Sequence, residues 1–234
     1  MRSALILILC LFLNLPALAQ PAVPELDQGL QELASEFFEW RRIQQPASGD
    51  DIPRVERPQA WVPKFSPEDL ALQRVRYRDF LKRLESLSQE SFSRADKVDA
   101  LALEAAIKRV GWEIDVLRAP HRNPLFYVDQ TLGSIFELLV LSSPIDDQRL
   151  NEIALRLRHF SSSLASAEKN LNEAVQPFAV ATIDSLMDIE DRLSSVKAGL
   201  TPFIGEDQLE EMELAFSSAA RAHRYDPIHP WTRH

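Results

Sequence analysis

Apolar residues recur along most of this chain at intervals of three and four positions, the period of an α-helix with one buried face. From Leu103 to Leu117 the intervals are 4, 3, 4 and 3, and from Ile153 to Leu171 they are 4, 3, 4, 3 and 4. A third row runs from Leu186 to Leu200 at intervals of 3, 4, 3 and 4. Because each row stops after a few turns at a helix breaker, the pattern favours core-packing helices over a coiled coil.

Cap and turn residues predict where the helices begin and end. At Ser66-Pro67-Glu68-Asp69 the serine can cap a helix, the proline suits its first turn, and the two carboxylates face the positive end of the helix dipole. Prolines at positions 120, 124, 144 and 177 break or restart the pattern. The predicted helices cover Leu26 to Ile43, a stretch from Ser66, Arg94 to about Leu117, stretches after Pro144 and Pro177, and Gly205 to about Ala222.

Two segments need separate interpretation. The very apolar stretch from Val128 to Ser142 is predicted to be a buried helix, although its length also permits a strand. Residues 44 to 64 hold four prolines, which fix φ and remove backbone donors, so this segment is expected to run extended over the surface with Trp61 pinning it to the helices. Helix after helix with short breaks indicates an all-α protein, a multi-helix bundle of antiparallel helices.

The amino terminus carries the pattern of a secretory signal peptide. Arg2 precedes a short apolar run, and Ala17-Leu18-Ala19 supplies a small-residue cleavage site, so residues 1–19 are expected to be removed. Cys10 lies in this run behind Leu9, which makes it a poor lipidation site, and the mature chain would have no cysteine. We therefore expect an exported protein, periplasmic or extracellular, without a transmembrane anchor after cleavage.

Charge excludes some partners. The formal net charge of −9 disfavours sequence-independent binding to nucleic acid or to an anionic membrane surface. Basic residues do cluster between Arg74 and Arg83, but acidic residues alternate with them. The cluster is interpreted as a solvated mixed-charge face rather than a phosphate-binding stripe.

Motifs that would carry chemistry are scarce. The six glycines are scattered, which excludes a glycine-rich phosphate loop, and no H-E-x-x-H zinc motif occurs. The spacing S-x-x-K occurs at Ser166/Lys169 and Ser194/Lys197 without the motifs that accompany it in serine-nucleophile enzymes. We therefore predict no catalytic, cofactor-binding or metal-binding residue in this chain.

The histidines and acidic clusters have structural interpretations. Glu152 and His159 lie two turns apart and can share a helix face but hardly one metal ion, and His121 can hydrogen-bond within its turn. Residues 223–234, with His223, His229 and His234, are predicted to be a disordered tail. The remaining acidic clusters are interpreted as first-turn or solvent-facing residues; they are Asp146-Asp147, Glu206-Asp207 and Asp188 with Glu190-Asp191.

Several short motifs resemble the amino-terminal half of the bacterial family called domain of unknown function 885. The motifs are Phe65-Ser66-Pro67-Glu68, Asp96 with Asp99, Asn123-Pro124-Leu125, Asn170-Leu171 and Pro177-Phe178. The likeness covers about Leu33 to Ala222. It implies a helical relative of zinc metallopeptidases of the gluzincin type, whose members are usually more than twice this length and carry an H-E-x-x-P-G-H-like motif in the carboxyl-terminal half.

The resemblance implies that the family's zinc and catalytic residues would lie beyond His234, so zinc is expected only in full-length members. Residues 20–222 would form one helical domain, truncated relative to the family and without catalytic activity alone. Its partner would be a peptide substrate or the missing carboxyl-terminal half. Two alternatives stay open: a helical binding or scaffold module of the cell envelope, and a hydrolase with an unrecognised site.

Overall fold

All regular elements that the computed structural model describes, in residues 27–48, 56–88, 90–141 and 144–223, are helices, which confirms the all-α prediction. The signal-peptide pattern, His229 and His234 lie outside the described residues. The α-helices are α1 (Gln28–Gln44), α2 (Pro67–Ser86), α3 (Arg94–Gly111), α4 (Ala119–Arg122), α5 (Leu125–Val128), α6 (Ser134–Leu139), α7 (Asp147–Asn170), α8 (Gln176–Leu186), α9 (Ile189–Leu200) and α10 (Leu209–His223). Two π-helical segments and one 3₁₀ turn complete the set: η1 (Trp112–Leu117), η2 (Asp129–Gly133) and η3 (Thr201–Phe203).

Capping boxes start α2 and α3. The Ser66 hydroxyl accepts a hydrogen bond from the Asp69 amide at 3.1 Å, and the Asp69 carboxylate accepts one from the Ser66 amide at 3.0 Å. Ser93 and Asp96 repeat this exchange at the start of α3. Each pair satisfies two backbone amides that would otherwise lack a partner, so the start predicted at Ser66 is confirmed.

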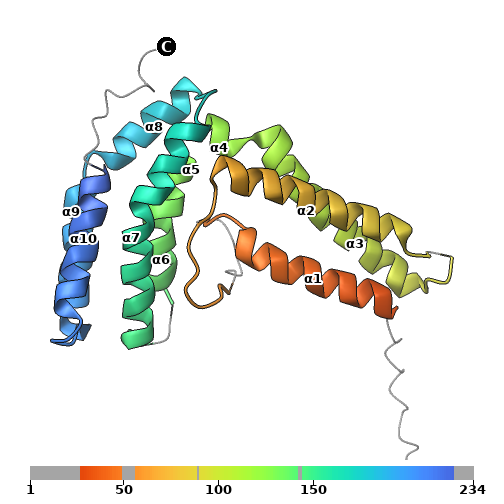
Figure 1. Cartoon of the computed structure of the whole chain (residues 1–234), viewed down its shortest axis with the longest axis horizontal. Coiled ribbons are helices and arrows are strands. Elements are labelled where there is room, and N and C mark those ends of the chain that lie inside the picture. Colours follow the sequence, from red (N-terminus) through yellow and green to blue (C-terminus); the bar gives the residue numbers. More distant parts are fainter. Residues whose placement is uncertain (1–26, 49–55, 89, 142–143, 224–234) are drawn as a thin grey trace, which may run out of the picture.

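The helices form two groups that meet at an angle (Figure 1). In the first group, α1, α2 and α3 enclose a core in which the rings of Phe37 and Phe80 meet edge-on, with centroids 5.4 Å apart. Ile107 and Val110 of α3 complete the centre of this core. The buried face of α3 is the row that the sequence pattern predicts.

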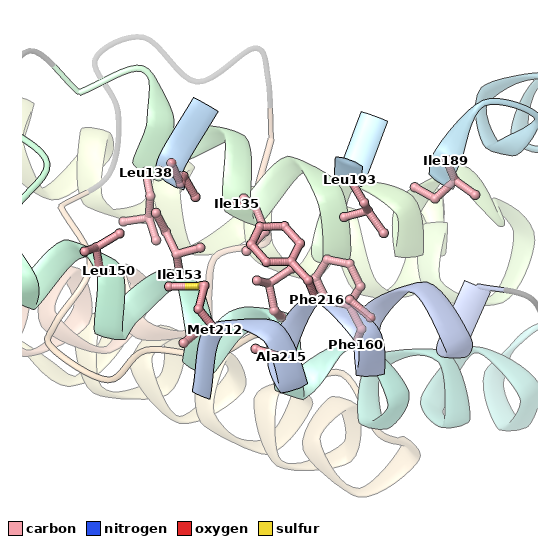
Figure 2. Packing of buried hydrophobic residues seen from close by; sticks show 14 residues of the cluster. Ile135, Leu138, Leu150, Ile153, Phe160, Ile189, Leu193, Met212, Ala215 and Phe216 are labelled. Atoms are coloured by element: carbon pink, nitrogen blue, oxygen red, sulfur yellow. The ribbon is translucent and has the colours of Figure 1, made fainter. Parts of the chain in front are cut away.

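In the second group α7 packs against α6 and α10, α9 packs against α10, and the four helices share one apolar core (Figure 2). Leu150, Ile153 and Phe160 project from α7 into this core, and Met212 and Phe216 reach it from α10. A buried side chain of this size stabilises the fold by about 1.5–3 kcal/mol. The apolar stretch predicted as a helix from Val128 to Ser142 is helical up to Leu139, as the end of α5, the π-helical η2 and α6, and it is buried in part; Ser142 lies outside the described residues.

Three boundaries differ from the sequence prediction. The row from Leu186 to Leu200 spans two helices, because α8 ends at Leu186 and α9 begins at Ile189. Residues 206–208 form a turn that precedes α10, so the helix does not begin at Gly205. Leu117 is exposed although it continues the apolar row of α3, since a π-helical turn is wider than 3.6 residues and rotates the side chains that follow it off the buried face.

Of the proline-rich segment predicted at residues 44–64, residues 49–55 lie outside the described residues. The following stretch lacks regular structure apart from a turn at Gln59-Ala60, and it holds buried as well as exposed side chains, so the prediction of a surface segment is only partly confirmed. Residues 56–65, here called the strap, pass between the two helical groups (Figure 1). Trp61, Pro63 and Phe65 are buried, and so is Ala47 at the end of the first described stretch. Helix side chains satisfy backbone groups of the strap in this position.

Candidate functional site

One polar face of α7 holds the backbone of the strap. The Glu152 carboxylate accepts a hydrogen bond from the Ala60 amide at 2.6 Å, His159 Nε2 lies 2.8 Å from the Pro63 carbonyl oxygen, and Asn170 Nδ2 donates to the Phe65 carbonyl at 2.6 Å. Spacings of 7 and 11 residues place the three side chains on the same face of the helix. An extended proline-rich segment cannot pair its own backbone groups, so α7 does this instead.

A charged cluster surrounds Trp61 on the same face. The guanidinium carbons of Arg57 and Arg156 lie 4.2 and 4.9 Å from the centroid of the indole ring. The Glu137 carboxylate on α6 is 3.6 Å from Arg57 and 3.4 Å from Arg156. Burial lowers the pKa of Arg156, while the carboxylates of Glu137 and Glu152 oppose that shift. The indole N–H donates to the Ile43 carbonyl at 2.8 Å, which confirms the pinning role predicted for Trp61.

The π-helical turn η2 completes the junction, the region between the two helical groups in which the strap lies. The Gln130 amide oxygen accepts from the Ala47 amide at 2.8 Å, and its nitrogen donates to the carbonyls of Ala47 and Phe126, both at 3.1 Å. The Thr131 hydroxyl contacts the Tyr127 carbonyl, and Arg156 donates to the Ser134 carbonyl. Side chains thus satisfy carbonyl groups that the wider turn displaces from the ordinary helical ladder.

Each histidine that the structure describes has a structural contact. His121 Nδ1 lies 2.9 Å from the Asn170 carbonyl oxygen, a contact between α4 and the end of α7. His159 and Glu152 share a helix face as predicted, and that face holds the strap. His223, assigned to the tail by the sequence, is instead the last residue of α10, and its ring packs edge-on against Phe160 with centroids 5.4 Å apart. Burial lowers the pKa of His223 to about 4.

The acidic clusters lie at helix starts or in turns. Asp146 caps α7 by accepting from the Arg149 amide at 2.9 Å, as predicted. Glu190 and Asp191 fall in the first turn of α9, whereas Glu206 and Asp207 lie in the turn before α10 rather than in its first turn. Among the described residues, no three His, Cys, Asp or Glu side chains come together as a metal site.

The basic cluster on α2 is a network of ion pairs. Arg83 and Arg76 both bind Glu36 of α1, and Arg74 lies 2.6 Å from Asp115 on η1. Arg78 reaches the same Asp115 carboxylate at 3.3 Å. Hydrogen bonds from Arg83 lower the pKa of Glu36, which is the direction expected for a carboxylate paired with arginine. The cluster has the mixed charge predicted from the sequence, and its arginines link α2 to its neighbouring helices.

Apolar side chains are exposed on several helices, Leu72 and Val75 of α2 among them, and two sets of them, here called stripes, each follow one side of a helix. The first follows α3 into η1 and contains Val98, Leu101, Trp112 and Val116, which are between 52% and 65% exposed. The second lies on α8 at Val180, Ile183 and Met187, which are between 41% and 71% exposed. A groove of about 330 Å³ runs beside the first stripe between α2 and α3. Both stripes have helical spacing and face outward within the described chain.

The exposed positions differ in part from those expected from the sequence. The sequence predicts an exposed apolar surface, able to contact another protein, at residues 138–141 and on the last helix. Leu138, Met212 and Phe216 instead belong to the core of the second group, while Leu141 and Leu214 are exposed. Among the described residues, no helix combines the length and the apolar character that crossing a bilayer requires.

Sequence reasoning missed the strap-binding face of α7. Its signal is a polar row at intervals of 4, 3, 4 and 7, formed by Glu152, Arg156, His159, Ser163 and Asn170. Such a row is typical of a solvated helix face. Only the folded structure reveals that these polar side chains are buried: Arg156, Ser163 and Asn170 are each less than one-tenth exposed.

Comparisons with known proteins show the fold alone. No family model matches this chain, and no curated protein matches it. A solved structure from Shewanella oneidensis, described as a candidate lipoprotein of unknown function, superposes with a TM-score of 0.62 at 10% sequence identity. The superposition covers 84% of this chain and 35% of the Shewanella protein, so the chain spans about a third of that protein's length.

Proposed function

We propose that this chain is a helical docking module of an exported protein related to the domain of unknown function 885 metallopeptidases. It supplies a wall of packed helices for another protein body and carries no reactive centre of its own. The family motifs and the signal-peptide pattern support this assignment. The structural neighbour supports it too, because there a similar helical unit belongs to a longer chain described as a candidate lipoprotein.

The observation that carries the proposal is that α3 has two apolar faces. One face, with Leu103, Ile107 and Val110, fills the core of the first group. On the opposite side, Val98 and Leu101 of α3 are exposed, and so are Trp112 and Val116 of η1 further along, with the charged side chains of Lys108 and Arg109 between the two pairs. A helix that is apolar on both sides is normally enclosed on both sides. A contiguous exposed apolar patch of more than a few hundred Å² is typical of an interaction surface.

The polar residues that could carry chemistry have packing roles. Glu152 and His159 bind the strap, Asp115 pairs with Arg74, and Asp146 caps α7. Hydrogen bonds from Tyr77 and Arg74 outweigh the effect of burial and lower the pKa of Asp115, so this carboxylate stays ionised beside its partners. These contacts support a structural role for the polar groups rather than a catalytic one.

A peptide-cleavage assay and a surface assay together test the proposal. The chain from Gln20 onward, incubated with zinc and a mixed peptide library, is expected to release no product above the buffer control. It is also expected to bind a hydrophobic dye, and the double variant Leu101→Lys/Val116→Lys should lose most of this binding. Leu214→Lys is the matched control, because Leu214 is exposed to a similar degree on a different helix.

Two results would contradict the proposal. The first is metal-dependent turnover that a point change in this chain abolishes, because it would show a reactive centre within the module. The second is dye binding that the double variant leaves unchanged while Leu214→Lys reduces it. In that case the outer face of α3 would not be the docking surface.

A further inference from the structure

The helix α8 has an apolar composition but packs very little of itself. Thr182 is its buried residue, whereas Phe178, Val180 and Ile183 are exposed, as is Met187 at its carboxyl-terminal cap. Figure 1 shows α8 lying across one end of the second helical group, next to α5. This position leaves its outward side without a neighbour among the described residues.

The outward side of α8 is a helical stripe. Val180, Ile183 and Met187 follow one another at spacings of three and four, so they lie in a row on one face. This is the spacing at which an amphipathic helix presents its anchor residues to a partner. The long, flexible side chain of Met187 can adapt its shape to a partner surface, which suits it to such a contact.

Acidic residues border this stripe on one side. Asp184 is four residues after Val180 and three before Met187, so it neighbours both on the helix surface. Asp188 and Asp191 follow at the corner between α8 and α9, and all three are exposed. The chain as a whole has a formal net charge of −9. The edge of the stripe is therefore negative.

We propose that the α8 stripe binds an amphipathic helix of another protein whose apolar face is flanked by lysine or arginine. Apolar side chains of the partner would cover Val180, Ile183 and Met187, and its basic residues would meet Asp184 and Asp188. Opposite charges across the contact favour this partner over others. A second copy of the chain would bring two acidic borders together, and an anionic lipid surface would repel them.

This inference is independent of the proposed function, because the α8 stripe and the outer face of α3 lie on different helical groups. A partner could occupy either stripe without the other. Loss of one binding activity would therefore leave the other intact, and the two proposals can fail separately.

The probe for the test is a fluorescein-labelled peptide of about 16 residues, long enough to form a helix on binding. It carries leucine at i, i+3 and i+7 with lysine on both flanks, and a companion peptide has glutamate in place of lysine. Fluorescence anisotropy with the chain from Gln20 onward should show binding of the lysine peptide, weakened by added salt, and at least tenfold weaker binding of the glutamate peptide.

Three variants locate the contact. Ile183→Ser/Met187→Ser should reduce affinity for the lysine peptide at least tenfold, and Asp184→Lys/Asp188→Lys should shift the preference toward the glutamate peptide. Leu214→Ser is the control and should leave both affinities unchanged. Circular dichroism of each variant should match the parent chain, and a variant that loses helix is replaced by Met187→Gln alone.

Other outcomes would overturn the proposal. They include no binding of either peptide at high micromolar concentration, equal binding of both peptides, and a parent chain that dimerises through α8. Binding of anionic phosphatidylglycerol vesicles in place of the lysine peptide would contradict it as well. So would binding of the peptide only after residues 224–234 are deleted, because that segment of the chain would then be the occupant of the stripe.

Discussion

His159 Nε2 lies 2.8 Å from the carbonyl oxygen of Pro63, a residue 96 positions earlier in the chain. This contact joins the polar face of α7 to the strap. Because the strap passes between the two helical groups, the residues that hold it also set how the groups meet.

Acid should lower the stability of the folded chain by protonating His159. Burial lowers the pKa of His159, and the nearby Lys64 acts in the same direction, while the hydrogen bond to Pro63 and the Asp69 charge oppose them. The folded chain therefore binds fewer protons than the unfolded chain, whose histidines titrate near about 6.5. The stabilising contribution of the neutral His159 ring should be fully present above that pH, and the free energy of unfolding should decrease as the pH falls below it. Urea titrations at neutral and mildly acidic pH should show a smaller decrease for His159→Gln.

His223 should make the end of α10 sensitive to acid. Its pKa is lowered to about 4 by burial, so the stabilising effect of the neutral ring is lost progressively between about pH 6.5 and that value. The free energy of unfolding would decrease by at most about 3 kcal/mol in total. Local fraying of the helix end exposes the ring to water and makes the decrease smaller. Hydrogen exchange of the amides in α10 should accelerate below neutral pH, and His223→Phe should remove most of that acceleration.

Trp61 and Trp112 should respond differently to the same substitution. Trp61 is 4% exposed between two guanidinium groups, so Trp61→Ala should cost about 3–5 kcal/mol of unfolding free energy. Trp112 is 52% exposed, and Trp112→Ala should cost less than about 1 kcal/mol. Chemical denaturation of both variants gives the two losses of unfolding free energy to be compared. Equal losses would show that the strap is not held through the indole of Trp61.

Gln130→Leu should destabilise the junction. It removes the groups that pair with the buried amide and carbonyl of Ala47, and each unpaired backbone group costs about 1–3 kcal/mol. Gln130→Glu places a buried carboxylate oxygen against the carbonyls of Ala47 and Phe126, so at neutral pH it should be at least as destabilising. Gln28→Leu removes an exposed hydrogen bond to Glu32 and should change the unfolding free energy by less than about 0.5 kcal/mol. Thermal unfolding should show both Gln130 variants well below the parent chain and Gln28→Leu close to it.

Two glycine-to-alanine changes should have opposite signs. A Cβ at Gly111 would lie 3.0 and 3.2 Å from two ring carbons of Tyr77, whose hydroxyl is held by Asp115. Gly111→Ala should therefore lower the unfolding free energy by about 1–2 kcal/mol despite the better helix propensity of alanine. At Gly199 a Cβ has nothing within 4 Å, so Gly199→Ala in α9 should gain about 0.5–1 kcal/mol. Denaturation midpoints of the two variants test the signs.

Sequence reasoning predicts the helices well because their signals are local. The box at Ser66 and Asp69 involves residues three apart, and the apolar row that begins at Leu103 is a property of one helix. Failures occur where local signals are interrupted. The row from Leu186 to Leu200 keeps its spacing across the break between α8 and α9, so spacing alone cannot show that two helices are present.

The contacts of the strap could not be predicted in this way. The hydrogen bonds from α7 that hold it join residues 92 to 105 positions apart, as between Ala60 and Glu152 or Phe65 and Asn170. On their own helix, Glu152 and Arg156 look like solvent-facing residues. Their burial depends on a segment that arrives from elsewhere in the chain and brings unpaired backbone groups to them.

The amino-acid sequence by itself determines that the chain is helical, where most helices start, and which apolar rows can form a core, because hydrogen bonding and side-chain period within a helix are set by neighbours a few residues away. Only the tertiary structure decides which polar residues hold the strap and which apolar residues stay outside. Met212 and Leu214 show this difference: both are apolar and two positions apart on α10, yet Met212 is in the core and Leu214 faces outward. Their burial depends on which face of α10 meets α7.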